Sequence, residues 1–286
     1  MDKTNTINNQ QNYILIFEKA VLTMGSTVYQ PFTNHLASSE WRLLAWLERE
    51  NIAYDMISGY DLHCNPRILN NYQCIVLSSH CEYWSSDMFE TLKKAHNEQN
   101  LWILNLSGNT LYRQIEFFDD GSSRCISLSF QKNYADETQL IGVRFTMRDY
   151  GTCAAYKVKK PEHWAFNNIH FHPDYPYFGE QSLLQNTPKK GWSYDPGRLG
   201  LANGLYGAGA SGWETDKLSR SAPKDCYIIA SGMNKGGGAD MVVREPSGSR
   251  GGMFSASSIS FPAALLIDYR ASQLVKNILT RALDDK

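Results

Sequence analysis

The chain has 286 residues, of which 28 are lysine or arginine and 29 are aspartate or glutamate, so its formal net charge is -1. With 42% hydrophobic residues it has the composition of a globular protein, whereas an intrinsically disordered chain combines low hydrophobicity with high net charge. A general nucleic-acid-binding protein needs an excess of basic residues, so the balanced charge excludes nucleic acid as the expected partner.

The sequence also predicts where the protein resides and how its chain is divided. No apolar run approaches the roughly 18 residues that a membrane helix needs, and the polar start carries no secretory signal. The six cysteines form no C-x-x-C pair, which is typical of reduced thiols in a cytoplasmic protein. We therefore expect a cytoplasmic protein with a disordered tail at residues 1–12 and a single domain at residues 13–286.

Strands and helices are expected to alternate in the first 115 residues. Apolar runs predict strands at residues 13–17, 53–57, 74–78 and 101–106. A helix should begin at Ser38 or Ser39, with Trp41 and Trp46 in the core, and a second helix capped by Ser86 should run to residue 97. The segment between residues 59 and 66 is expected to be a turn-rich connection.

This alternation predicts an α/β fold with a mainly parallel central sheet and helices on both faces. In such sheets, ligands bind at the carboxyl ends of the strands. Two polar loops leave such ends, one after residues 74–78 and the other after residues 101–106. We therefore expect the functional site between these two loops.

The second half of the chain is less regular. Residues 115–130 should form extended pairs around a DDGSS turn, and two further strands should flank the turn NKGGG. Residues 160–223 have little periodicity and are expected to be an irregular insertion over the ligand edge of the sheet. A long amphipathic helix is predicted for residues 261–284, with Ile267 among its core residues.

Seven segments, in order, resemble one known family. They are EWRLLAWLERENIAYDMISGYDLH, YQCIVLSSHCEYWSSDMFETLKKA, LSGN, SGWETDK, SGMNKGGGADMVV, GGMFSASSISFPAALL and SQLVKNILTRAL. Together they are similar to the C-terminal catalytic region of the large (beta) subunit of N,N-dimethylformamidase and its relatives. The resemblance covers the chain from about Asn34 onward.

The resemblance implies a class I glutamine-amidotransferase-like fold and an amide-hydrolysing enzyme with a mononuclear iron, Fe3+. In the family, two tyrosines and a glutamate hold the iron, and a histidine and an asparagine lie close by. Carried over by motif, the glutamate is Glu82, the histidine is His80 and the asparagine is Asn109. The upstream stretch that holds the family's tyrosines is mostly absent here, which leaves Tyr29 as the candidate ligand and makes weak or no iron binding the expectation.

The leading hypothesis is therefore a hydrolase of a carbon–nitrogen bond in a small-molecule amide. Glu82 and Tyr29 would bind iron, His80 would assist proton transfer and Asn109 would polarise the carbonyl. One alternative is a metal-free relative whose aromatic insertion binds a carbohydrate or a peptide, and another is a thiol hydrolase that uses Cys81. A homo-oligomer is compatible with the sequence.

Two further pairs of residues were considered for the site. Glu214 and Asp216 in SGWETDK could bind a cation or orient a loop through backbone N–H groups, and the second role is the one expected. His170 and His172 have the H-x-H spacing of metal ligands on a strand, although their segment has the composition of a loop.

Overall fold

The computed structural model describes residues 13–17, 37–180 and 209–284. The tail predicted for residues 1–12 and the candidate ligand Tyr29 lie outside the described residues. None of the helices in the described part of the chain is long and apolar enough to span a membrane.

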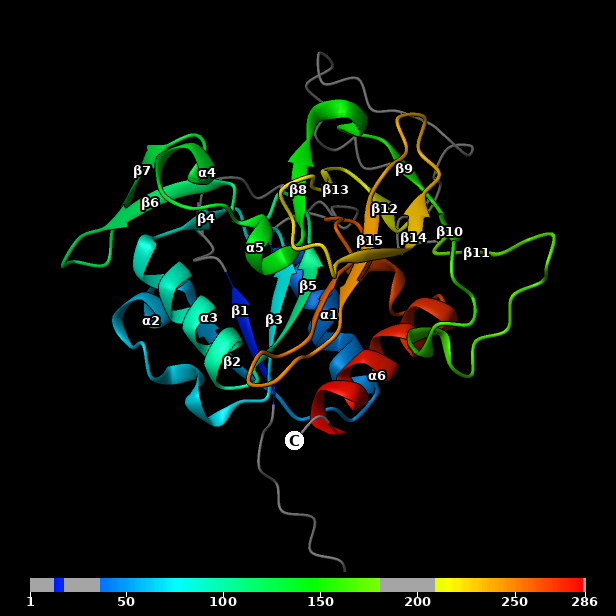
Figure 1. The fold of residues 1–286 in the computed structure, drawn as a ribbon, viewed down its shortest axis with the longest axis horizontal. Coiled ribbons are helices and arrows are strands. Elements are labelled where there is room, and N and C mark those ends of the chain that lie inside the picture. Colours follow the sequence, from blue (N-terminus) through cyan, green and yellow to red (C-terminus); the bar gives the residue numbers. More distant parts are fainter. Residues whose placement is uncertain (1–12, 18–36, 181–208, 285–286) are drawn as a thin grey trace, which may run out of the picture.

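A nine-stranded sheet forms the centre of the molecule (Figure 1). Its strands, from one edge to the other, are β11 (Tyr177–Phe178), β10 (Tyr156–Val158), β14 (Tyr227–Gly232), β15 (Asp240–Arg244), β16 (Met253–Ser255), β5 (Trp102–Ser107), β3 (Cys74–Ser79), β1 (Tyr13–Phe17) and β2 (Asp55–Ser58). The strands from β16 to β2 pair in parallel, and all pairs from β16 back to β11 are antiparallel.

The expectation of a mainly parallel sheet is therefore wrong, since four of the eight strand pairs in this sheet are antiparallel. The reason lies in the short connections of the second half of the chain. Strands joined by a short turn such as NKGGG run in opposite directions, because a parallel pair needs a crossover of a dozen or more residues. The hairpin β14–β15 thus extends the parallel sheet on one side with antiparallel strands.

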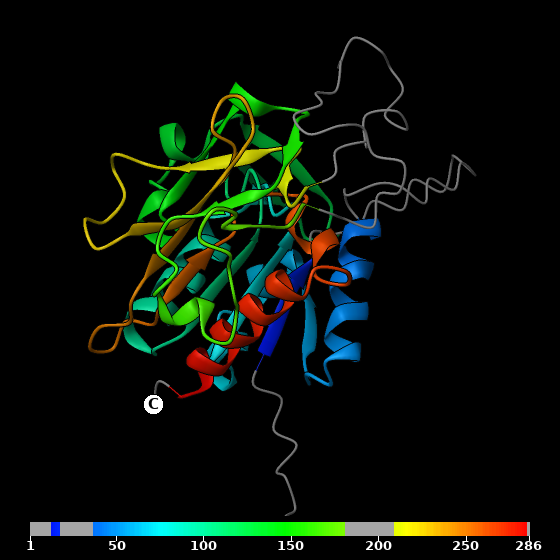
Figure 2. The same ribbon diagram turned by 90° about the vertical axis from the view of Figure 1, so that its right-hand side faces the viewer.

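Helices cover both faces of the sheet, as expected (Figure 2). One face packs against α1 (Ala37–Arg49) and α6 (Tyr269–Asp284), and the other packs against α2 (Gly59–Cys64) and α3 (Ser86–Glu98). Successive residues of β3 alternate between the two cores, with Val76 facing α1 and α6 and Ile75 facing α3. The strand is buried along its whole length, which explains its continuous apolar sequence.

Two predictions about the first helices need correction. Trp41 is 69% exposed, whereas Trp46 is fully buried and donates its indole N–H to Ser272. Trp41 lies two positions before Leu43 and therefore on the opposite face of α1. The helix α3 is capped by Ser85 and not by Ser86, since the Ser85 hydroxyl accepts the backbone N–H of Met88.

Two further segments differ from expectation. The connection that was expected to be turn-rich contains α2, which starts with a capping box between Ser58 and Asp61. The predicted C-terminal helix is broken into a 3-10 turn at Phe261–Ala264 and α6, and Ile267 is 42% exposed between them. Pro262 lacks a backbone N–H and suits the start of the short turn.

Smaller sheets and helices lie beyond the carboxyl ends of the parallel strands (Figure 1). They comprise the three-stranded sheet of β4 (Tyr83–Trp84), β6 (Arg113–Phe117) and β7 (Ser123–Ser127), the pair of β8 (Val143–Thr146) and β13 (Thr215–Leu218), the pair of β9 (Cys153–Ala154) and β12 (Ser211–Gly212), and the helices α4 (Phe130–Asn133) and α5 (Thr138–Ile141). Part of the segment expected to be irregular is thus regular structure, and residues 181–208 of it lie outside the described residues.

Candidate functional site

The loop after β3 carries two of the candidate residues. His80 and Glu82 follow the last strand residue, Ser79, whose positive φ of 56° turns the chain away from the sheet. The backbone carbonyl of Glu82 accepts N–H groups from Tyr112 at 3.0 Å and Arg113 at 2.9 Å, which fixes the loop against the segment after β5. Within this loop, Nε2 of His80 lies 3.2 Å from Oε2 of Glu82.

A second acidic residue completes this cluster from a distant part of the sequence. Oε2 of Glu214 lies 3.3 Å from the same Nε2 of His80, so the imidazole is placed between two carboxylates. The other oxygen of Glu82 forms an ion pair with Nε of Arg113. The side chains of His80, Glu82 and Glu214 are only 8%, 6% and 13% exposed, so their interactions are weakly screened by water.

The charge state of Glu82 follows from these neighbours. Burial alone would raise the pKa of Glu82, but the hydrogen bonds and positive charges of His80 and Arg113 outweigh it and hold the pKa below its usual range. Glu82 is therefore an ionised carboxylate, with His80 at one of its oxygens and Arg113 at the other.

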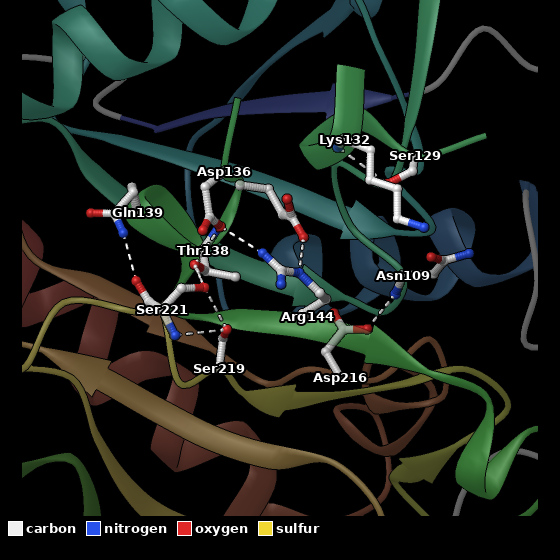
Figure 3. A network of polar contacts seen from close by, with 11 residues as sticks. Asn109, Ser129, Lys132, Asp136, Thr138, Gln139, Arg144, Asp216, Ser219 and Ser221 are labelled. Atoms are coloured by element: carbon white, nitrogen blue, oxygen red, sulfur yellow. Dashed lines mark hydrogen bonds and ion pairs between the residues drawn. The ribbon is translucent and has the colours of Figure 1, made fainter. Parts of the chain in front are cut away.

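Asn109 follows β5 and reaches the same edge of the sheet. Its backbone N–H donates to Oδ1 of Asp216 at 2.8 Å, as Figure 3 shows, and its own Oδ1 is buried without a hydrogen bond from any described residue. Asp216 thus orients a loop through a backbone N–H group, which is the role expected for it. Glu214 takes a different part and faces His80.

Glycine is required where the two loops meet. A Cβ atom on Gly108 would lie 2.3 Å from the carbonyl oxygen of Glu214 and 2.8 Å from the backbone nitrogen of Ile259. Only a residue without a side chain lets the segment after β5 approach Glu214 this closely. Asn109 and Glu214 are brought to one region of the molecule by this contact.

Unusual backbone conformations gather in the same region. Among the non-glycine residues that the structure describes, Ser79, Asn109, Leu111, Trp213 and Ser257 have positive φ values between 54° and 69°. Such conformations cost free energy and cluster at functional sites, where the surrounding structure enforces them. The positive φ values therefore also indicate that the functional site lies at the ends of β3, β5 and β16.

Asp216 is the most strongly perturbed acid of this region. It is fully buried, and burial together with the nearby negative charges of Glu214 and Glu137 raises its pKa to about 7, although backbone N–H groups of Asn109 and Thr110 partly compensate. Its Oδ2 accepts no hydrogen bond within the described part of the chain.

The described residues do not fit the iron site that the resemblance implies. Both oxygens of Glu82 are engaged by His80 and Arg113, and no group of three or more His, Cys, Asp or Glu side chains in the described ranges is arranged to hold a metal. Tyr29 lies outside these ranges, so its role stays a prediction. His172 is 71% exposed and pairs with Asp174, away from the cluster.

The thiol of Cys81 is turned away from His80 and Glu82. It is 1% exposed in the core beneath α3, and its sulfur donates to the backbone carbonyl of Ser78 at 3.4 Å. A nucleophile must reach its substrate, so this placement argues against the thiol hydrolase.

Solved structures share the overall fold. A ThuA-like protein from Bacteroides uniformis matches with a TM-score of 0.50 and 12% identity, over 100% of this chain and 97% of that one. A cytoplasmic protein from Salmonella typhimurium matches with a TM-score of 0.49 and 11% identity, over 94% and 99% of the two chains. The match to the Bacteroides uniformis protein, together with the four antiparallel strand pairs, shows a mixed α/β fold of the ThuA-like kind, and the glutamine-amidotransferase-like layout expected from the sequence is wrong.

The family follows from the sequence match. The family model described as N,N-dimethylformamidase beta subunit-like, C-terminal, matches residues 2–135 and 127–273. The chain belongs to this family, which confirms the resemblance seen in its motifs. No curated protein matches the chain significantly.

Two residues of the cluster, Glu214 and Arg113, carry no clear signal in the sequence. Glu214 was expected to be structural, and Arg113 carries no motif that distinguishes it from a surface arginine. The sequence signal that could have indicated Glu214 is its position in SGWETDK, a segment in which two acidic residues follow a glycine. Only the pairing of β13 with β8 and the close contact at Gly108 bring it to His80.

Proposed function

We propose that this chain hydrolyses a carbon–nitrogen bond of a small-molecule amide. The observation that supports the proposal is the placement of Nε2 of His80 between the buried carboxylates of Glu82 and Glu214 at the carboxyl ends of the sheet. A histidine held by carboxylates is the usual proton carrier of hydrolytic sites. Membership of the amidase-like family points to the same reaction.

The reaction divides among these residues as follows. Nδ1 of His80 removes a proton from the attacking water, while its Nε2–H faces Glu82 and Glu214, whose negative charges stabilise the imidazolium that forms. The water oxygen bonds to the carbonyl carbon, and the carbon–nitrogen bond breaks as the proton passes from His80 to the departing amine. The side-chain amide of Asn109 donates to the carbonyl oxygen as negative charge develops there. Asp216 positions Asn109, and no step is derived through a metal.

The test is the release of ammonia from formamide and acetamide, and of dimethylamine from N,N-dimethylformamide, by the whole chain. Removing a general base or its charged partner lowers the rate by roughly 100-fold or more, so Glu82→Gln and Glu214→Gln should each show a loss of that order. Glu116→Gln is the matched control, because Glu116 is 49% exposed and pairs with Arg124 on the surface.

Two results would contradict the proposal. One is full activity in both Glu82→Gln and Glu214→Gln. The other is that protein shown to be folded by circular dichroism releases neither ammonia nor dimethylamine from any amide in the panel. Equal melting temperatures of wild type and variants would show that a loss of rate is not a loss of folding.

A metal-free binding module is the second candidate function. The ion pair between Arg113 and Glu82 favours it, because a carboxylate that is already paired with an arginine is not available to bind a metal. The described aromatic side chains of the insertion support it only in part. Trp164 packs edge-on against Trp102, and Phe178 stacks on Tyr156, so both belong to the core. Tyr175 and Tyr177 remain as a tilted pair near the surface. Ligand binding without turnover would favour this candidate.

We also propose a cytoplasmic location and a small-molecule amide as the partner. All six cysteines are free thiols in the structure, and this is the state that a reducing compartment maintains.

A further inference from the structure

A pocket lies beside the candidate site and is not used by the reaction proposed above. It encloses about 520 Å³ between α4, β8 and the segments after β5 and β7. Its polar lining includes Ser129, Lys132, Glu137 and Arg144, and an aromatic wall is formed by Tyr112 and Phe145. A pocket of this size accepts a molecule as large as an amino acid or a dipeptide.

One carboxylate of this pocket has an unused oxygen. Glu137 is 2% exposed, and its Oε1 accepts Nε of Arg144 at 2.6 Å. Its Oε2 is buried and has no hydrogen bond from the residues that the structure describes. A buried carboxylate oxygen without a donor is costly, and a bound donor group would remove that cost.

Arg144 does not compensate Glu137 fully because it is shared. Its Nη2 also pairs with Asp136 at 2.7 Å, and Figure 3 shows Arg144 beside Asp136 within the network that Thr138 and Ser221 complete. Burial raises the pKa of Glu137 in spite of Arg144, whereas hydrogen bonds from Thr138 and Ser221 help to lower that of Asp136. Glu137 is therefore the acid of the pair with one oxygen that no described residue satisfies.

A positive charge lines the other part of the pocket. Lys132 extends from α4 on the side of the network where Arg144 and Asn109 lie (Figure 3), and its ammonium forms no ion pair with a described residue. Between the two charged groups, Leu128 and the edge-to-face pair of Tyr112 and Phe145, with ring centroids 5.3 Å apart, provide apolar surface.

We propose that this pocket binds a small zwitterion of the amino-acid class, with its carboxylate on Lys132 and its ammonium group on the carboxylate of Glu137, whose buried Oε2 turns toward the pocket on binding. The apolar side chain of the ligand lies against Leu128, Tyr112 and Phe145. Among the described residues, the lining carries one carboxylate oxygen without a donor and one ammonium group without an ion pair, so a ligand with both charges satisfies both ends. The pocket is distinct from the His80 cluster, and the proposal does not depend on amide hydrolysis.

The test is calorimetric titration of the whole chain with three probes. L-Leucine carries both charges, L-leucinamide lacks the carboxylate and 4-methylpentanoate lacks the ammonium group. We expect L-leucine to bind, and each truncated probe to bind at least about tenfold more weakly, which corresponds to one lost ion pair. Glu137→Gln and Lys132→Gln should weaken L-leucine binding by a similar factor.

Asp136→Asn is the matched control, because Asp136 pairs with the same Arg144 but does not line the pocket. It should change the affinity for L-leucine less than about threefold. Lys132 lies on the exposed side of α4, so Lys132→Gln keeps the test decisive if Glu137→Gln fails to fold. Absence of L-leucine binding by the wild type, equal affinity for L-leucinamide, or unchanged affinity in Lys132→Gln would overturn the proposal.

Discussion

The buried acid Asp216 makes the stability of this protein depend on pH in a way that one substitution can isolate. Its pKa is about 7 in the folded chain against 3.8 as the ordinary value, so the folded state binds its proton more tightly than the unfolded state. Well below pH 4, Asp216 is protonated in both the folded and the unfolded state, so its titration does not change the free energy of unfolding. As the pH rises towards 7 the unfolded state loses the proton first, and the free energy of unfolding falls.

The size of this effect follows from the pKa difference. Three pKa units correspond to about 4 kcal/mol, which is an upper limit because structural relaxation around the buried charge reduces it. Asp216→Asn keeps an oxygen for the backbone N–H of Asn109 and removes the charge. At pH 4 the free energy of unfolding of the variant should therefore equal that of the wild type within about 1 kcal/mol. At pH 8 it should be higher than that of the wild type by roughly 2 to 4 kcal/mol.

The assay is urea unfolding followed by tryptophan fluorescence between pH 4 and pH 8.5. The difference between Asp216→Asn and the wild type cancels the other titrating groups, and it should rise up to about pH 7 and then remain constant. Asp149→Asn is the matched control, because Asp149 is also buried but accepts N–H groups from Gly236 and Gly238, so its variant should lose stability at pH 8. A pH-independent difference for Asp216→Asn would refute the reasoning.

Three further predictions test other features of the structure. Gly108→Ala should lower the free energy of unfolding by about 1 to 3 kcal/mol in urea titrations, because its Cβ would meet a backbone oxygen at 2.3 Å, whereas Gly59→Ala meets only the flexible end of a methionine and should be nearly neutral. His96 is buried and its pKa is lowered to about 4 from 6.5, chiefly by burial, so it stays neutral in the fold while the unfolded state gains a proton. Stability should therefore fall by up to about 3 kcal/mol from pH 6.5 to pH 4, and His96→Gln should lose this slope in the same titration. Iodoacetamide should alkylate the exposed Cys64 long before the buried Cys81, as measured by peptide mass spectrometry, and early modification of Cys81 would contradict the structure.

The sequence predicted the local elements of the parallel half of the fold well. Continuous apolar runs such as residues 74–78 can be satisfied only by burial on both faces, so strands and helices were recognised close to their true bounds. The antiparallel extension was missed because the sequence predicts a hairpin around NKGGG but does not show that this hairpin joins the parallel sheet. Which strands become neighbours is decided by tertiary packing and is not encoded in apolar periodicity. Trp41 was misplaced for a related reason, since a helical stripe wide enough to include it does not show which edge faces the sheet.

The candidate site was only partly accessible to sequence reasoning. His80 and Glu82 are two residues apart, so their contact follows from a single loop. The second carboxylate of the cluster, Glu214, comes from β-structure late in the chain, and its approach depends on the tight packing at Gly108. Such long-range contacts are decided by tertiary packing, and one sequence contains no direct signal for them.

The distance along the chain between the parts of the site has a consequence for folding. The bond from Asn109 to Asp216 joins residues 107 positions apart, so the loop it closes must form before the site exists. Chains rich in such contacts fold slowly, because the entropy of closing a long loop is lost before the contact compensates for it. The contact between His80 and Glu214 should thus form last during refolding, after the secondary structure of α1, α3 and α6 has formed. A probe of this contact would then report completion of the whole fold and not of any single element.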